Sequence, residues 1–252
     1  MNPLERVQLT QTRHLWQRKR GHRTGTDDIL CAWAAHSVAP EGARRALELG
    51  AGQGAVSLIL TDLLPTVHIT AVEAQVVSFE LLERNVGENH LNERYALHCA
   101  DLRQLSFEQG SFDLVFGTPP FMPLGSGTLP QDSQRAAARF EMRGGIETYC
   151  IAASQALRDG GGCAMVMDAA RPERYEEALK RSSLSLERVT SVVPMVGSPP
   201  TYLVYEAKKG SAQDRPPERS EMAIRSSTNE LSDPYRAMRV ALELPTDRQL
   251  SP

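Results

Sequence analysis

Long apolar runs and clustered cysteines are what this 252-residue sequence lacks. No stretch reaches the roughly 18 apolar residues of a membrane-spanning helix, and the N-terminus has no apolar segment of a secretory signal. We therefore expect a cytoplasmic protein with no membrane partner. The four cysteines, Cys31, Cys99, Cys150 and Cys163, form no C-x-x-C pair, which argues against a disulfide framework or a zinc site. We expect reduced core thiols and no bound metal.

A large excess of one charge is also missing, because 28 Lys and Arg residues face 31 Asp and Glu residues. Net charge therefore gives no argument for nucleic-acid binding. The arm at residues 1–24 differs, since Glu5 is its only acidic residue. Such an arm can follow phosphates, and a solvated basic face is the alternative. Trp16 within it is either a stacking surface or a packing anchor. The basic residues singled out are Arg13, Arg18, Lys19, Arg20 and Arg23.

Strand-like and helix-like segments alternate along the rest of the chain. Apolar residues make up 41% of the sequence, enough to fill one core of this size. Strands are expected at 46–49, 67–72, 95–99, 112–116, 162–167, 189–193 and 202–206, with a further alternating segment at 221–225. Helices are expected at 26–40, 55–63, 76–85, 135–157, 172–182 and 234–244. This alternation predicts an α/β fold with a parallel sheet covered by helices on both faces.

A glycine loop, Glu48-Leu49-Gly50-Ala51-Gly52-Gln53-Gly54, follows the first of these strands. The spacing Gly50-x-Gly52-x-x-Ala55 satisfies the dinucleotide fingerprint, in which glycines let the backbone approach a pyrophosphate. The spacing Gly50-x-Gly52-x-Gly54 is instead typical of S-adenosylmethionine loops. The glycines alone do not decide between the two cofactors.

Polar residues at the next strand ends favour S-adenosylmethionine. Glu73 ends the second strand, where a carboxylate can accept both ribose hydroxyls, and Asp101 ends the third, where it can accept from an adenine amine. The prolines after the fourth strand occupy the place of a methyl acceptor. A dehydrogenase would need a hydride-transfer constellation that we do not find. Each carboxylate also has a structural alternative, as a buried cap for Glu48 and as helix or turn caps for Glu73 and Asp101.

The tetrapeptide Thr118-Pro119-Pro120-Phe121 predicts the kind of acceptor. Two prolines lack backbone donors and have a fixed φ, so the strand must stop and present its last carbonyls. A carbonyl, a small polar side chain and an aromatic face suit a flat ring with an exocyclic NH2 group. We therefore predict methyl transfer to a planar nitrogen. The alternative is a proline-rich turn after a buried strand.

A loop rich in Gly, Ser and Pro follows Phe121 and leads to Arg135, Arg139 and Arg143. Their fourfold spacing places them on one face of the predicted helix, where they can bind substrate phosphates. Alternatively, Arg139 pairs with an acidic residue nearby, either Glu141 or Glu147. A mobile segment beside the acceptor would suit ordering on substrate binding.

Several of these segments resemble one known family. The run from Gly21 to Leu30, the glycine loop, and Phe112-Asp113-Leu114-Val115 with the proline tetrapeptide look like the bacterial N6-adenine methyltransferases that modify the anticodon-adjacent adenine of valine tRNA. Residues 221–225 and 233–238 are similar to that family's closing strand and terminal helix, so the resemblance covers nearly the whole chain. It implies a Rossmann-like class I methyltransferase with a seven-stranded, mostly parallel sheet. It also implies S-adenosylmethionine as cofactor and RNA, in particular tRNA, as partner.

The resemblance implies roles for single residues as well. The implied cofactor residues are Thr26 and Asp27 at the methionine end, Glu48 with Gly50, Gly52 and Gly54 at the amino acid part, Glu73 at the ribose, and Asp101 at the adenine. Thr118 to Phe121 would carry the transfer, and the basic arm with Arg139 would contact RNA. The methyltransferase domain would span 25–207. A surface loop would then cover 208–219, and a strand and helix within 220–252 would complete the same domain; a disordered C-terminus is the alternative.

Two residues depart from the family's Asn-Pro-Pro-Tyr motif. Phe121 stands in place of the Tyr and keeps the aromatic face. Thr118 stands in place of the Asn, and its shorter hydroxyl must turn a lone pair toward the amine. Other aminomethyltransferases resemble this pattern with Ser at that position. We therefore expect an RNA adenine N6-methyltransferase. The alternatives are a same-fold enzyme acting on a protein glutamine, an rRNA guanine N2 or a small molecule, and a cofactor-binding protein without catalysis.

Overall fold

The computed structural model describes residues 3–210 and 215–245. Its central sheet contains, in chain order, β3 (Arg45–Leu49), β4 (His68–Glu73), β5 (Tyr95–Cys99), β6 (Phe112–Gly117), β7 (Leu157–Asp168), β8 (Leu184–Met195), β9 (Tyr202–Lys209) and β10 (Glu218–Arg225). The spatial order is β10-β8-β9-β7-β6-β3-β4-β5. Neighbours are parallel except at β9, which runs antiparallel to both β7 and β8. The predicted α/β fold with a mostly parallel sheet is confirmed.

The number of strands differs from the prediction. The family resemblance implies a sheet of seven strands, whereas the described residues form a sheet of eight. The strand expected at 221–225 is part of β10, which pairs in parallel with β8 at the edge of the sheet. Met222 is its buried anchor. The C-terminal segment therefore extends the same sheet by one strand.

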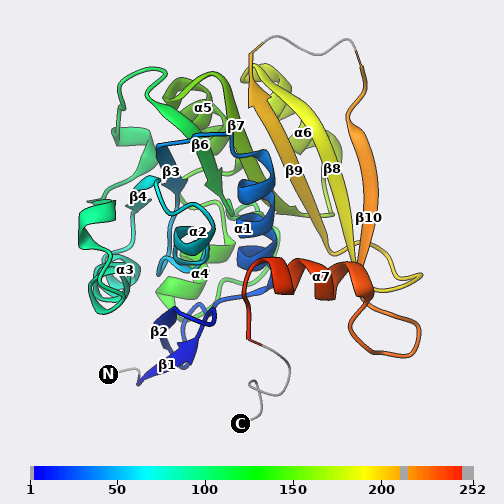
Figure 1. Cartoon of the computed structure of the whole chain (residues 1–252), viewed down its shortest axis with the longest axis horizontal. Helices are drawn as coiled ribbons and strands as arrows, with labels where there is room; N and C mark the ends of the chain where they lie inside the picture. The colour runs from blue at the N-terminus through cyan, green and yellow to red at the C-terminus, as the bar shows by residue number, and fades with distance from the viewer. Residues whose placement is uncertain (1–2, 211–214, 246–252) are drawn as a thin grey trace.

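Helices cover both faces of the sheet (Figure 1). They are α1 (Thr26–Val38), α2 (Ala55–Leu63), α3 (Val76–Glu88), α4 (Ser133–Arg139), α5 (Ile146–Ala156), α6 (Pro172–Arg181) and α7 (Asp233–Ala241). Because strand side chains alternate between faces, Ala46 and Leu47 of β3 belong to different apolar clusters. The cluster of Ala46 includes α1, α2, α3 and α7, and the cluster of Leu47 includes α5 and α6. Strands that are buried on both faces explain the continuous apolar runs of the sequence.

One predicted helix is divided in two. The sequence predicts a largely helical segment at 135–157, but α4 ends at Arg139 and α5 begins at Ile146. Between them, Phe140 forms a parallel bridge with Met122, and Gly144 adopts a φ of +100°. The pairing with the loop after Phe121 competes with the helix, and this pairing has no local sequence signal.

The basic arm contains a hairpin that the sequence does not predict. Strands β1 (Leu4–Gln8) and β2 (His14–Arg18) pair antiparallel, and β2 docks on α3 through two buried amides. Asn85 exchanges hydrogen bonds with the backbone of Trp16 at 2.7 and 3.0 Å. Asn89 does the same with His14 at 3.2 and 2.8 Å. Within the described chain, the arm is therefore a hairpin attached to the domain.

Trp16 is a packing anchor in this arrangement. The guanidinium of Arg84 lies 3.8 Å from the centre of its ring, and its indole N–H donates to Glu88 at 2.6 Å. A cation covers one face of the ring, which supports the packing anchor among the two alternatives.

The segments at the C-terminal end fall partly outside the described residues. The expected surface loop at 208–219 contains the undescribed residues 211–214, with β9 ending at Lys209 and β10 beginning at Glu218. Helix α7 lies against β10, and the tail at 246–252 is likewise outside the described residues. No helix of residues 3–210 and 215–245 is long and apolar enough to cross a membrane. Cys99 is exposed, whereas the other three cysteines are buried as expected.

Candidate active site

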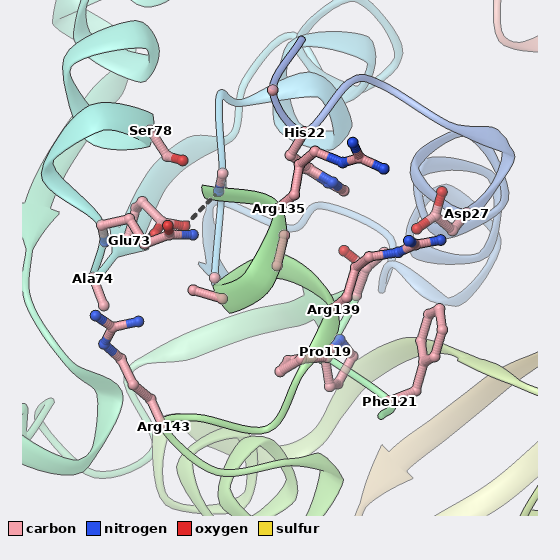
Figure 2. A pocket seen from close by; sticks show the side chains of 18 of the residues that line it. His22, Asp27, Glu73, Ala74, Ser78, Pro119, Phe121, Arg135, Arg139 and Arg143 are labelled. Carbon is pink, nitrogen blue, oxygen red and sulfur yellow. Dashed lines mark hydrogen bonds between the residues drawn. The ribbon is translucent and has the colours of Figure 1, made fainter. Parts of the chain in front are cut away.

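A cavity of about 670 Å³ opens at the carboxyl ends of the central strands. Figure 2 shows several of its lining residues. The loop after β3 contributes Gly50 and Gly52, and the ends of β4 and β5 contribute Glu73 and Asp101. The tetrapeptide after β6 contributes all four of its residues. Parallel strands end at the same edge of a sheet, so segments far apart in sequence meet in one cavity of ligand size.

The glycine loop adopts a left-handed backbone conformation that residues with a side chain rarely adopt. Gly50, Gly52 and Gly54 have φ values of +68°, +57° and +88°. A Cβ atom at Gly50 would lie 2.2 Å from the hydroxyl oxygen of Tyr149. Gly54 precedes α2 and is not among the residues that line the cavity. The loop thus presents backbone atoms instead of side chains, and Tyr149 of α5 packs against it.

Glu73 is buried and already holds the loop in place. One carboxylate oxygen accepts from the backbone N–H of Gly52 at 2.8 Å, and the other accepts from Gln75 at 2.7 Å. Burial raises the pKa of Glu73. A carboxylate has about four lone-pair sites, so two remain for hydroxyl donors such as those of a ribose.

Glu48 lies behind the loop in a second, smaller cavity of about 30 Å³. It is 2% exposed, and its Oε2 atom has no hydrogen-bond partner among the described residues. Burial raises the pKa of Glu48 to about 8. A buried oxygen without a partner is rare and indicates a missing donor. An ammonium group or a water molecule supplies such a donor.

The start of α1 brings further carboxylates close to the loop. Asp27 lines the large cavity, and Asp28 lines the small one. Asp28 accepts from the backbone N–H of Gly25 at 2.9 Å, and burial raises its pKa well above the usual value. Thr26 is not among the residues that line either cavity. The structure thus brings Asp27, but not Thr26, to the cavity.

Asp101 lies at the far end of the cavity in an ion pair. Its oxygens accept from the guanidinium of Arg103 at 2.9 and 2.7 Å, and these bonds lower the pKa of Asp101. The carboxylate is therefore charged and can accept a further bond from an amine.

The acceptor tetrapeptide is held from two sides. Pro119 is buried, whereas Thr118 and Phe121 are half-buried and face the cavity. Arg171 donates to the carbonyl oxygen of Phe121 at 3.4 Å. The next residue, Met122, donates to the carbonyl of Arg139 at 3.0 Å. The aromatic ring thus has a fixed backbone and an open face.

The basic arm divides into residues at the cavity and residues in ion pairs elsewhere. Lys19, Arg20 and Arg23 line the cavity, and Arg23 also forms an ion pair with Glu5 at 2.9 Å. Arg13 pairs with Asp62 on α2, and Arg18 pairs with Asp132 at 2.8 Å. The structure therefore does not place Arg13 and Arg18 among the lining residues.

Arg139 lines the cavity together with Arg135 and Arg143. The alternative pairing of Arg139 with Glu141 or Glu147 does not form, because Arg174 occupies both carboxylates at 2.7 Å. In Figure 2, Arg135 lies beside His22, Arg139 points toward Asp27, and Arg143 lies beside Ala74 and Glu73.

Tyr149, Tyr202 and His22 are among the lining residues that the sequence analysis did not single out as site residues. Tyr149 and Tyr202 look like core residues of a helix and a strand, and His22 lies in a polar segment. Only the family-like run at 21–30 carried a signal for His22. Among the described residues, no group of three or more His, Cys, Asp or Glu side chains could hold a metal.

Comparison with known proteins supports a methyl-transfer site. The family model described as a methyltransferase domain matches residues 46–139. The chain is 26% identical over 219 residues to a Porphyromonas gingivalis protein named tRNA1(Val) (adenine(37)-N6)-methyltransferase, with 84% of this chain and 85% of that protein covered. Relatives from Shewanella baltica and Escherichia coli have the same name.

Solved structures agree with this fold. A crystal structure of a predicted O-methyltransferase from Agrobacterium tumefaciens matches with a TM-score of 0.64 at 17% identity, covering 86% of this chain and 98% of that chain. A 16S rRNA methyltransferase of Thermus thermophilus in complex with AdoMet and guanosine matches with a TM-score of 0.56 at 20% identity. The match covers 82% of this chain and 50% of that chain.

The fold and the glycine loop are similar to those of class I S-adenosylmethionine-dependent methyltransferases, and the methyltransferase-domain model matches the part of the chain from β3 to α4. The predicted resemblance to the bacterial tRNA(Val) adenine N6-methyltransferases is confirmed by the curated relatives. The cofactor fits the residues present. The glycine loop lets a ligand approach its backbone closely, and the remaining lone pairs of Glu73 and the unpartnered oxygen of Glu48 can accept hydrogen bonds from it.

Proposed function

We propose that this chain transfers a methyl group from S-adenosylmethionine to the exocyclic N6 of an adenine in tRNA. The observation that carries the proposal is the meeting of the glycine loop and the tetrapeptide at 118–121 in one cavity. The curated relatives named as tRNA adenine N6-methyltransferases support the choice of acceptor.

The cofactor half of the cavity would hold S-adenosylmethionine along the strand ends. Glu48 and the backbone at Gly50 would receive the amino acid part, Glu73 the ribose hydroxyls, and Asp101 the adenine amine. Asp27 would lie at the methionine end. When bound, the cofactor supplies an electrophilic methyl group on a sulfonium.

The acceptor half compensates for a weak nucleophile. An adenine amine has its lone pair conjugated into the ring. Hydrogen bonds from the amine to the Thr118 hydroxyl and to a backbone carbonyl beside Pro119 draw electron density back onto the nitrogen. Stacking on Phe121 offsets the cost of taking the base out of its stack. Orientation and electrostatics, rather than a strong base, would supply the acceleration.

The basic residues at the mouth would contact the RNA. Lys19, Arg20 and Arg23 line the cavity from the N-terminal arm. A polyanion gains affinity by releasing counterions when such side chains approach its phosphates. Arg13 and Arg18, by contrast, would contribute by fixing the hairpin, because they pair with Asp62 and Asp132 and do not line the cavity.

The deciding experiment is incubation with isotopically labelled S-adenosylmethionine and fractionated cellular RNA, followed by nucleoside analysis. We expect label in N6-methyladenosine from the tRNA fraction, and roughly 5- to 150-fold slower labelling with Phe121→Ala at the same enzyme concentration. Label in N2-methylguanosine, or in a protein fraction instead of RNA, would move the acceptor to guanine or to a protein side chain. Cofactor binding without any transfer would contradict catalysis.

A further inference from the structure

Two arginines on α4 face the cavity mouth without an acidic partner. Arg135 and Arg139 lie four residues apart on this helix, both are exposed, and both line the cavity. Neither forms an ion pair with a residue in the described part of the chain. Like charges at this spacing destabilise a helix. Such an arrangement is stabilised by an external anion.

The carboxylates that flank α4 are occupied by other arginines. Asp132 precedes the helix and pairs with Arg18 at 2.8 Å. Glu141 follows it and pairs with Arg174 at 2.7 Å. These two bridges link the ends of α4 to the hairpin and to α6, so neither carboxylate forms an ion pair with Arg135 or Arg139. Asp27 is the carboxylate toward which Arg139 points in Figure 2.

The orientation of α4 is fixed by a buried amide. Gln134 is 1% exposed and donates to the Ser78 hydroxyl at 3.0 Å. Its oxygen accepts from the side chain of Arg18 at 3.1 Å and from the backbone N–H of His22 at 3.2 Å. The helix therefore presents Arg135 and Arg139 to the cavity before any ligand binds.

Arg143 belongs to a different part of the cavity. Figure 2 places it beside Ala74 and Glu73, at the cofactor end. Its charge partly offsets the burial that raises the pKa of Glu73, and it adds to the effect of Arg103, which lowers the pKa of Asp101. Although the three arginines share a fourfold spacing in sequence, the break after Arg139 separates Arg143 from the helix.

We propose that Arg135 and Arg139 bind backbone phosphates of the RNA strand that carries the acceptor base, whereas Arg143 acts on the cofactor. This inference rests on the proposed RNA substrate. Exposed guanidiniums that line the same cavity as Phe121 suit the phosphates of a strand whose base stacks on that ring. The phosphate contacts position the strand and do not select its sequence.

The test uses the double variant Arg135→Gln/Arg139→Gln, the single variant Arg143→Gln, and Arg181→Gln as control. Arg181 is exposed on α6 and pairs with Glu177, so its loss removes one surface charge far from the mouth. Affinity for a fluorescent tRNA anticodon stem-loop is measured between 50 and 300 mM salt, and affinity for S-adenosylmethionine is measured by calorimetry.

The double variant should lower the slope of log affinity against log salt by about 1.4, at roughly 0.7 per single-strand phosphate contact. At 0.1 M salt this corresponds to about 25-fold weaker RNA binding. Cofactor affinity should not change. Arg143→Gln should weaken cofactor binding and leave the salt slope of RNA binding unchanged. Arg181→Gln should match the wild type in both measurements.

Each outcome decides between the inference and the function. An unchanged salt slope in the double variant, with wild-type tRNA methylation intact, overturns the phosphate contacts and leaves the function standing. A reduced slope in a protein that methylates no RNA overturns the function and keeps the contacts. Wild-type protein that binds the stem-loop without salt dependence overturns both. Weaker cofactor binding in the double variant contradicts the assignment of Arg135 and Arg139 to RNA and of Arg143 to the cofactor.

Discussion

The hydroxyl oxygen of Tyr149 occupies the space beside Gly50, 2.2 Å from where a Cβ atom would stand. The pair joins α5 to the loop that would receive the cofactor. Tyr149 also meets Gly117 at the end of β6, where an added Cβ would lie 3.4 Å from its ring. One side chain thus fits between the loops after β3 and β6.

Gly50→Ala should therefore weaken S-adenosylmethionine binding by about tenfold or more. The substitution adds a left-handed strain of roughly 1 kcal/mol and displaces Tyr149 from the loop. Gly42→Ala is the matched control, because Gly42 has a φ of +71° but nothing within 4 Å of its added Cβ. It should lose only the stability that the left-handed strain costs, and it should keep its cofactor affinity in calorimetry.

Phe121→Ala should reduce kcat/KM for RNA by roughly 5- to 150-fold, since base stacking on an aromatic contributes about 1–3 kcal/mol. Cofactor affinity should stay within about twofold, because the ring lies in the acceptor half. Phe121→Tyr keeps the aromatic face and should retain activity. An equal loss of cofactor binding in Phe121→Ala would contradict the assignment of this ring.

Thr118→Val keeps the shape of the side chain and removes its oxygen. Turnover under saturating cofactor should fall by about tenfold, the value of one neutral hydrogen bond of roughly 1.5 kcal/mol. Thr118→Asn restores a longer acceptor and should retain turnover. If the Val variant turns over at the wild-type rate, the hydroxyl takes no part in binding the amine.

Glu48 should make stability depend on pH. Burial raises its pKa to about 8, against about 4.3 in an unfolded chain. Between these values the folded state holds a proton that the unfolded state has lost, so the free energy of unfolding declines as pH rises. Stability from this group is complete below pH 4.3 and lost above pH 8.

The Glu48→Gln variant is neutral at every pH and should lack this decline. Denaturant unfolding without cofactor, at about pH 5 and at about pH 8.5, measures the difference. A wild type and variant with parallel pH dependence would show that Glu48 titrates normally.

The sheet and the strand-end residues could be predicted because they depend on local patterns. Apolar runs indicate buried strands, and parallel strands bring their carboxyl ends together, so Gly50, Glu73, Asp101 and Phe121 were found without knowing any distance. The same patterns gave no reason to select Tyr149, since an aromatic within an apolar helix looks like a core residue.

Features that depend on distant partners could not be predicted. The bridges of Arg13 to Asp62 and of Arg18 to Asp132 join residues 49 and 114 positions apart. The β1–β2 hairpin has mixed polar strands, and its stability comes from Asn85 and Asn89 on a helix much later in the chain. Without knowledge of these partners, the sequence of this cationic segment indicates only a flexible arm.

The amides of Asn85 and Asn89 have a practical consequence for experiments on the first 24 residues. Truncating the hairpin would remove the backbone partners of both side chains, at about 1 kcal/mol for each hydrogen bond lost, and would expose the surface of α3 that β2 covers. An arm-deleted protein would then lose activity through a damaged α3, the helix that begins just after Glu73. Substitution of single charged residues, rather than truncation, is the way to test what this segment binds.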